Sequence, residues 1–145
     1  MRNYGGYDAD LPMRRKYAQT FDCDSPLKWK PSEGDAVPQL VVIYLGTNDF
    51  SCGEHPALDD WCEGYLEIID QAKAWYGEEV PVLCVASKSD ARMVEYVREV
   101  CRRCPHSGVH ATALFADVHN DNSELGADQH PNYDGQRKVA AALMP

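Results

Sequence analysis

The chain has 145 residues, of which 44% are hydrophobic and 26% charged, a balance typical of one globular domain. Its formal net charge of −9 disfavours binding to the phosphate backbone of nucleic acids. It contains no apolar run of about 18 residues, so we expect no transmembrane helix. We therefore expect neither nucleic acid nor a membrane as a partner, and the composition leaves the oligomeric state open.

The cysteines give no pattern typical of a metal site. Only one close pair, Cys101-x-x-Cys104, occurs among the six of them. A structural zinc site would need two further ligands at suitable spacing, and no second close pair exists. We therefore expect no metal ligands, and we interpret the cysteines as ordinary thiols or as one or two disulfides.

Residues 1–38 carry few periodic apolar positions. They contain Gly5-Gly6 and four prolines, a composition typical of loops. We expect a long loop with one short helix near residues 14–21. We see no interdomain linker after it, and we treat residues 1–145 as one domain.

From about residue 39 onward, apolar runs alternate with helical patterns. Residues 40–45 form a continuous apolar run rich in β-branched side chains, which predicts a strand buried on both faces of a sheet. Apolar residues at three- and four-residue spacing predict a helix over about 57–76, and Gly77 fits its C-terminal end.

The same alternation continues to the end of the chain. Residues 80–86 predict a second strand, and Ser89-Asp90 fits the N-cap of a following helix. A weaker strand follows at about 111–118 and a last helix at about 132–143. This order predicts parallel strands with crossover helices, and hence an α/β fold that forms a three-layer α/β/α sandwich.

Gly46-Thr47-Asn48-Asp49 directly follows the most apolar strand. In a parallel sheet, ligands bind beyond the carboxyl ends of the strands. A side-chain amide such as that of Asn48 can donate a hydrogen bond to a developing oxyanion there. The four residues also suit an ordinary turn, and on their own they do not decide between a turn and a site.

Asp128-Gln129-His130-Pro131 precedes the last predicted helix. A histidine in this loop can stand at the same edge of the sheet and act as a general base toward a hydroxyl. Taken alone, a histidine such as His130 is more often an ordinary surface residue than a catalytic one. The other four histidines lack a comparable sequence context.

Together, the two motifs resemble the third and fifth blocks of the SGNH (GDSL-type) hydrolases. In that family, the residue that Asn48 matches lines the oxyanion hole, and the residue that His130 matches is the catalytic base. Three strings are also similar to carbohydrate esterase family 2, the acetylxylan esterase group: residues 2–6, residues 45–51, and His130-Pro131-Asn132 with Gly135-Gln136. The resemblance covers nearly the whole chain and implies a flavodoxin-like SGNH hydrolase fold.

The resemblance also implies an activity. A family 2 esterase removes acetyl groups from plant polysaccharides without a metal or organic cofactor. The implied partner is thus an acetylated polysaccharide or another small acyl ester, and the implied location is outside the cell. Beside Asn48, we expect Gly46, Asp49 and Phe50 to contact the substrate.

The sequence departs from the family at the nucleophile. No Gly-Asp-Ser triplet is present, and the nearest match is Cys23-Asp24-Ser25-Pro26. Ser25 stands only about 20 residues before Gly46, which leaves little room for the intervening helix and strand, and Pro26 favours a turn. We therefore expect the nucleophile block to precede Met1 in a longer protein. The chain would then be an N-terminally truncated esterase domain, inactive alone.

A second departure concerns the group that orients the histidine. SGNH enzymes commonly place an aspartate three residues before the histidine, where this chain has Ala127. Asp128 stands two residues before it and is a secondary candidate. In the esterase group resembled here, a backbone carbonyl often orients the imidazole, and an aromatic residue often precedes the histidine, where this chain has Gln129.

Two other functions remain open. The first is a catalytically inactive, carbohydrate-binding remnant in which exposed aromatic rings stack on sugars. Its candidates are Tyr4, Tyr7, Trp29 and Phe50, although Trp29 and Phe50 could instead pack beneath the loop. The second is an SGNH esterase that acts on a lipid or another acyl ester.

Overall fold

The computed structural model describes residues 13–19, 29–51, 55–87, 90–114, 122–127 and 130–144. Strands and helices alternate along this part of the chain, as the sequence predicts. The elements in chain order are α1 (Met13–Lys16), β1 (Val41–Ile43), α2 (Thr47–Ser51), α3 (Leu58–Tyr76), β2 (Val82–Ser87), α4 (Ala91–Arg103), β3 (Val109–Leu114), η2 (Asn122–Glu124) and α5 (Tyr133–Leu143).

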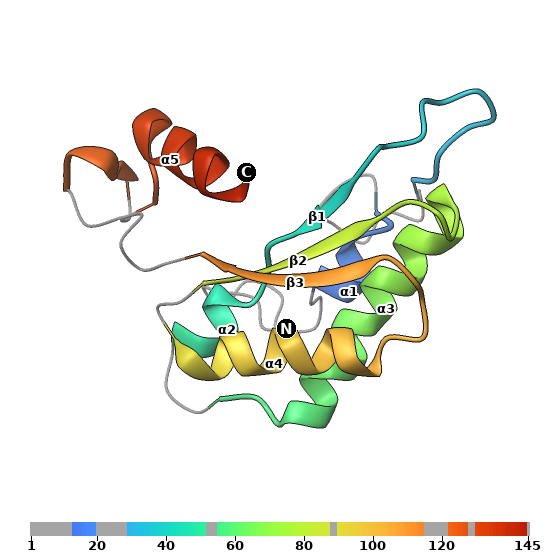
Figure 1. The fold of residues 1–145 in the computed structure, drawn as a ribbon, viewed down its shortest axis with the longest axis horizontal. Coiled ribbons are helices and arrows are strands. Elements are labelled where there is room, and N and C mark those ends of the chain that lie inside the picture. The colour runs from blue at the N-terminus through green and yellow to red at the C-terminus, as the bar shows by residue number, and fades with distance from the viewer. Residues whose placement is uncertain are drawn as a thin grey trace.

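The three strands form one parallel sheet in the order β1-β2-β3 (Figure 1). Val82 of β2 pairs with Val41 of β1 on one side and with Val109 of β3 on the other. Because all strands run the same way, their carboxyl ends meet at one edge of the sheet. The predicted parallel α/β architecture is confirmed.

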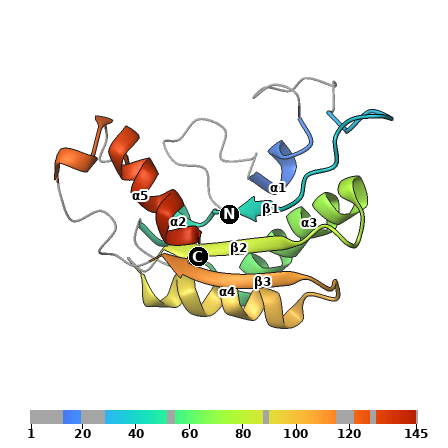
Figure 2. The same ribbon diagram turned by 45° about the horizontal axis from the view of Figure 1, so that its top comes forward.

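Helices α3 and α4 cover one face of the sheet (Figure 2). Alternate residues of β2 point to this face, among them the fully buried Cys84. The apolar stripe of α3 packs there through Trp61 and Tyr65, and that of α4 through Val97. This face carries the larger of the two apolar cores.

Helix α5 lies on the opposite face (Figure 2). Its Val139 packs against Val85 of β2 and Leu114 of β3, with Leu83 and Leu143 at the margin of this smaller core. The sheet therefore has helices on both faces, and the predicted three-layer sandwich is confirmed.

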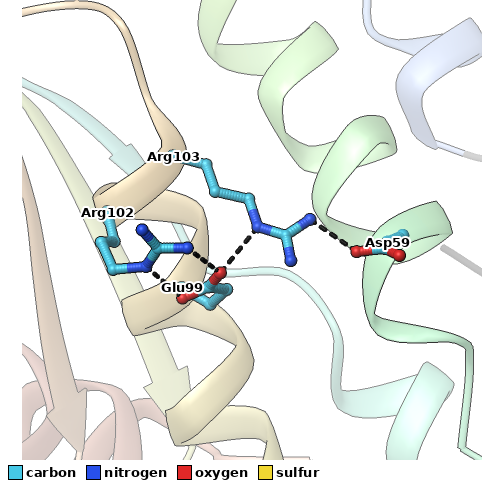
Figure 3. A network of polar contacts seen from close by, with 4 residues as sticks. All are labelled: Asp59, Glu99, Arg102 and Arg103. Carbon is cyan, nitrogen blue, oxygen red and sulfur yellow. Dashed lines mark hydrogen bonds and ion pairs between the residues drawn. The ribbon is translucent and has the colours of Figure 1, made fainter.

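Hydrogen bonds between polar side chains link α3 and α4, the two helices that cover the larger core. The Glu99 carboxylate of α4 accepts hydrogen bonds from Arg102 and Arg103, and Arg103 also donates to Asp59 of α3 at 2.7 Å (Figure 3). Hydrogen bonds from Arg102 and Arg103 lower the pKa of Glu99 to about 2. These groups are solvent-exposed, so we assign the network little net stabilisation.

A second polar cluster joins the loops at the amino-terminal edge of the sheet. The buried Lys73 ammonium of α3 donates to the carbonyls of Glu78, Val80 and Ser107, at 2.6, 3.0 and 2.8 Å. Beside it, the two ring nitrogens of His106 lie 2.8 Å from carboxylate oxygens of Asp70 and of Glu78. We call this cluster the loop latch, because it ties α3 to the loops that precede β2 and β3.

Several element boundaries differ from the predicted ones, those of the third and first strands among them. The third strand begins at Val109, two residues before the predicted start, because Gly108 ends the preceding turn with a positive φ of 67°. Phe115 to Val118, the rest of the predicted strand, lie outside the described residues. Strand β1 spans three residues rather than six. In the described part of the chain, no helix has the length and apolar character needed to cross a bilayer.

Candidate active site

The Gly46 turn carries the first set of predicted site residues. Gly46 follows β1 with a φ of 117°, and its carbonyl accepts a hydrogen bond from the Asp49 amide at 2.9 Å. The chain then coils into α2, which displays Asn48 at the surface and buries Asp49 and Phe50. This short helix follows the carboxyl end of β1, so the Asn48 amide is presented at the edge where parallel sheets bind ligands.

A buried aromatic cluster supports this turn. A Cβ atom at Gly46 would lie 3.1 Å from Trp61 Cζ2, so the glycine allows the backbone to approach the indole closely. Phe50 stacks edge-on against Trp61 and Tyr96, with ring centroids 5.8 and 5.2 Å apart. The Tyr65 hydroxyl donates to the Ile43 carbonyl at 3.1 Å and so fixes the end of β1. We call these rings the inner aromatic cluster; its members are Phe50, Trp61, Tyr65 and Tyr96.

Phe50 requires a correction to the sugar-binding alternative. That alternative counted Phe50 among the exposed rings, but its side chain is only 8% exposed. The apolar ring gains more by packing on Trp61 than by facing water. Any contribution of Phe50 to substrate binding is therefore through its support of α2.

The second predicted site residue, His130, lies in a compact turn before α5. The Gly126 amide donates to the His130 carbonyl at 2.7 Å, and the His130 amide donates to the Ala127 carbonyl at 3.1 Å. The exposed imidazole turns back on the same carbonyl, with Nδ1 3.3 Å from the Ala127 oxygen. A proton on Nδ1 satisfies this contact and leaves the Nε2 lone pair available to accept a proton.

Asn132 and Gly135 hold this turn against α5. The Asn132 side chain caps α5 by accepting from the amides of Asp134 and Gly135, and it donates to the Ser123 carbonyl at 2.7 Å. A Cβ atom at Gly135 would lie 2.5 Å from the Glu124 carbonyl oxygen, so only glycine lets α5 approach η2 this closely. The string that resembles family 2 thus has a local structural role around His130.

The elements next to both sets of residues lie toward one end of the molecule. Strands β2 and β3 point toward the end where α2 lies, and η2, which precedes His130, lies at this end too (Figure 1). Asn48 and His130 come from these two separate segments. Asp128 and Ser25 lie outside the described residues. Among the described residues, no group of three His, Cys, Asp or Glu side chains is arranged to hold a metal ion.

Two neighbours of the site were not assigned to a position from the sequence. The resemblance implied that a backbone carbonyl orients the imidazole, but no side-chain pattern reveals that Ala127 supplies it. His55 was set aside for lack of sequence context, yet its ring lies 5.3 Å from that of Phe50. Its Nε2 atom is also 3.8 Å from Asp90 Oδ2, and Asp90 caps α4. The only available signal for His55 was its position between the motif and the next helix.

Comparisons with known proteins agree with this architecture. The chain is 31% identical to a cellulase/esterase (CelE) from Acetivibrio thermocellus, over 97% of this chain and 17% of that protein. It is 26% identical to an acetylxylan esterase / glucomannan deacetylase from Cellvibrio japonicus, over 99% of this chain and 41% of that protein. No protein-family model matches the chain.

A solved structure has the same fold. The structure of a family two carbohydrate esterase from Cellvibrio japonicus aligns with a TM-score of 0.69 and 20% sequence identity, over 92% of this chain and 39% of that one. The chain spans less than half the length of each of these three proteins. It thus resembles the family 2 carbohydrate esterases in sequence, and it has the α/β fold of a solved member of that family.

Proposed function

We propose that this chain carries the general base and the oxyanion donor of a carbohydrate esterase that removes acetyl groups from plant cell-wall polysaccharide. The observation that supports this most is the state of His130. Its Nδ1 faces the Ala127 carbonyl, so Nε2 is available as a base. Asn48 belongs to α2, which lies at the same end of the sheet as η2, the element before His130.

The chemistry follows from these two groups. A hydroxyl oxygen, from a serine or from water, attacks the acetyl carbonyl carbon while His130 Nε2 accepts the hydroxyl proton. The carbonyl oxygen becomes an oxyanion, to which Asn48 donates a hydrogen bond. When the tetrahedral intermediate collapses, the imidazolium returns the proton to the departing sugar oxygen. With a serine, a second such cycle with water releases acetate.

The substrate class is inferred from the relatives. One is named an acetylxylan esterase / glucomannan deacetylase and another a cellulase/esterase, and both names refer to enzymes of plant polysaccharides. The chain covers only part of each, so an acetylated polysaccharide substrate is part of the proposal. The sequence has no Gly-Asp-Ser triplet, and we accordingly propose roles for His130 and Asn48 and leave the attacking hydroxyl open.

Release of acetate from acetylated xylan tests the proposal. With water as the attacking group, we expect about 10³-fold acceleration over the uncatalysed rate, which is the contribution typical of a general base such as His130. His130→Ala should return the rate to background, and Asn48→Ala should lower it. His110→Ala is the matched control, because His110 is an exposed histidine on β3, away from these motifs.

Equal rates for the unmodified chain and for His130→Ala would contradict the proposal. If such a chain still binds xylan, the inactive carbohydrate-binding alternative gains support. A faster reaction with long-chain acyl esters than with acetyl esters, again dependent on His130, would favour the lipid esterase instead.

A further inference from the structure

Tyr133 lies exposed next to the turn that bears His130. It is the first residue of α5 and is 76% exposed, the highest fraction among the large hydrophobic side chains in the described part of the chain. Single exposed apolar side chains are common on protein surfaces, so this exposure alone assigns no role. What distinguishes Tyr133 is its place in the chain, three residues after the proposed general base.

The connection between His130 and Tyr133 is held by several contacts. Pro131 forms a β-bridge with Leu125, and the Asn132 backbone amide donates to a carbonyl of η2 at 2.8 Å. Three residues span at most about 11 Å from Cα to Cα. Side chains on an α-helix lean toward its amino-terminal end, so the Tyr133 ring extends from α5 toward this turn. A substrate bound at His130 therefore has the ring as a close neighbour.

Arg137 supports the ring from one turn further along the same face of α5. Its guanidinium carbon lies 5.9 Å from the centroid of the Tyr133 ring, within the range of a cation–π contact. This contact restricts the ring, so less rotamer entropy is lost when a ligand packs on it. Arg137 is itself exposed, and its N–H groups can donate hydrogen bonds to hydroxyl oxygens beside the ring.

The chemistry at His130 decides which part of an ester lies next to this ring. The imidazolium returns a proton to the oxygen of the departing alcohol, so that oxygen has to lie within hydrogen-bond distance of the imidazole. The acyl carbonyl oxygen is the part that the Asn48 amide binds. The remainder of the alcohol consequently extends past His130, on the side where the chain continues into Tyr133.

The pair formed by Tyr133 and Arg137 matches one kind of alcohol. A flat aromatic face packs well on the C–H face of a saturated ring, and guanidinium N–H groups pair with hydroxyl groups at the edge of that ring. We propose that Tyr133 and Arg137 bind the alcohol portion of the ester and select a hydroxylated ring over a short or a purely apolar alcohol. The position of this portion beside His130 rests on the proposed function.

Acetyl esters that differ only in the alcohol test this inference. Relative to the uncatalysed rates, the unmodified chain should favour an acetylated methyl β-xylopyranoside over ethyl acetate. Tyr133→Ala should lower kcat/KM for the sugar ester about three- to tenfold, through KM, and leave ethyl acetate unchanged. Tyr133→Phe keeps the ring and should keep most of the preference. Met144→Ala is the matched control, because it removes a side chain that is 70% exposed at the other end of α5.

Cyclohexyl acetate separates the contributions of the two side chains. Its alcohol is a ring without further hydroxyl groups, so the unmodified chain should hydrolyse it with a higher KM than the sugar ester. Arg137→Met should narrow this difference by raising KM for the sugar ester alone. Circular dichroism checks that each variant is folded. An equal loss on all three esters in Tyr133→Ala would indicate a purely structural role and overturn the inference.

Binding of the alcohol alone gives a readout that does not depend on turnover. Saturation-transfer difference NMR with methyl β-xylopyranoside should show binding to the unmodified chain and to His130→Ala, and Tyr133→Ala should lose it. If this binding holds while no ester is hydrolysed, the proposed function fails and the binding surface stands. If Tyr133→Ala binds the glycoside as Met144→Ala does, the inference is wrong whatever the hydrolysis rates.

Discussion

At the scale of single residues, Gly46 determines how the site begins. Its φ of 117° is one that side-chain-bearing residues rarely adopt, and an added Cβ atom would lie 3.1 Å from Trp61 and 3.2 Å from Met93, closer than most such contacts. The glycine thereby sends the chain from β1 into α2 within three residues. Asn48 owes its position at the sheet edge to this turn.

Gly46→Ala should destabilise the protein by about 1–3 kcal/mol, from backbone strain with steric crowding added. Urea unfolding followed by tryptophan fluorescence measures the loss. Gly34→Ala is the matched control, since Gly34 also has a positive φ of 92° but has no atom within 4 Å of the added Cβ. A Gly46→Ala loss no larger than that of Gly34→Ala would show that Trp61 and Met93 yield without cost.

The orientation of His130 shows what residue types alone do not reveal. The resemblance implied that a backbone carbonyl orients His130, and Nδ1 contacts the carbonyl of Ala127. Asp128, the secondary candidate, lies outside the described residues. Every residue carries such a carbonyl, so the sequence at position 127 gives no sign of the contact. A side-chain substitution there leaves the acceptor in place.

At the scale of elements, most of the fold was predictable from apolar spacing. The predicted C-terminal end of α3 at Gly77 is confirmed, because the chain leaves the helix there with a φ of 98°. The predicted N-cap of α4 is confirmed at Asp90. The third strand had the weakest apolar pattern of the three. In β3, His110 and Thr112 alternate with apolar residues. This alternation interrupts the continuous apolar run by which the other two strands were identified. Contacts between loops, such as the loop latch, have no periodic pattern and could not be predicted.

The loop latch should make stability depend on pH. Hydrogen bonds to Asp70 and then to Glu78 raise the pKa of His106 above its ordinary value, which is about 6.5. Protonated His106 therefore stabilises the folded protein, and this contribution is complete below about pH 6.5, the pKa of histidine in the unfolded chain. The contribution is lost as the pH rises through the higher pKa of the folded state. The free energy of unfolding should therefore fall as the pH is raised from 6 to 8.5.

The variant His106→Gln should lack this part of the pH dependence, and urea unfolding at a series of pH values measures it. His110→Gln removes an exposed histidine and should keep the slope. Glu99, whose pKa is about 2, stays ionised throughout this range and does not contribute. An identical slope in the unmodified chain and in His106→Gln would show that other groups cause the dependence.

At the scale of the whole molecule, the two faces of the sheet are covered unequally. Helices α3 and α4 share the larger core with the sheet, whereas α5 attaches through Val139, Val85 and Leu114. The Asn132 side chain, next to the His130 turn, is hydrogen-bonded to η2 and to the first turn of α5. These segments form a unit with a small apolar attachment.

Helix α5 should consequently open at a lower free energy than α3. Hydrogen–deuterium exchange should show faster exchange for the amides of α5 than for those in the middle of α3. Val139→Ala should accelerate exchange in α5 and leave α3 unchanged. Matched protection in the two helices would mean that the molecule opens only as a whole.

Because α5 is held to the sheet by a smaller apolar core than α3 and α4, the two faces of the sheet should respond differently to heat. The Asn48 turn rests on the larger core, and the His130 turn travels with α5. Gentle warming would thus separate the two proposed site residues while most of the secondary structure persists. The proposed activity would then be lost before the protein melts, and cooling would restore it once the helix packs back onto the sheet.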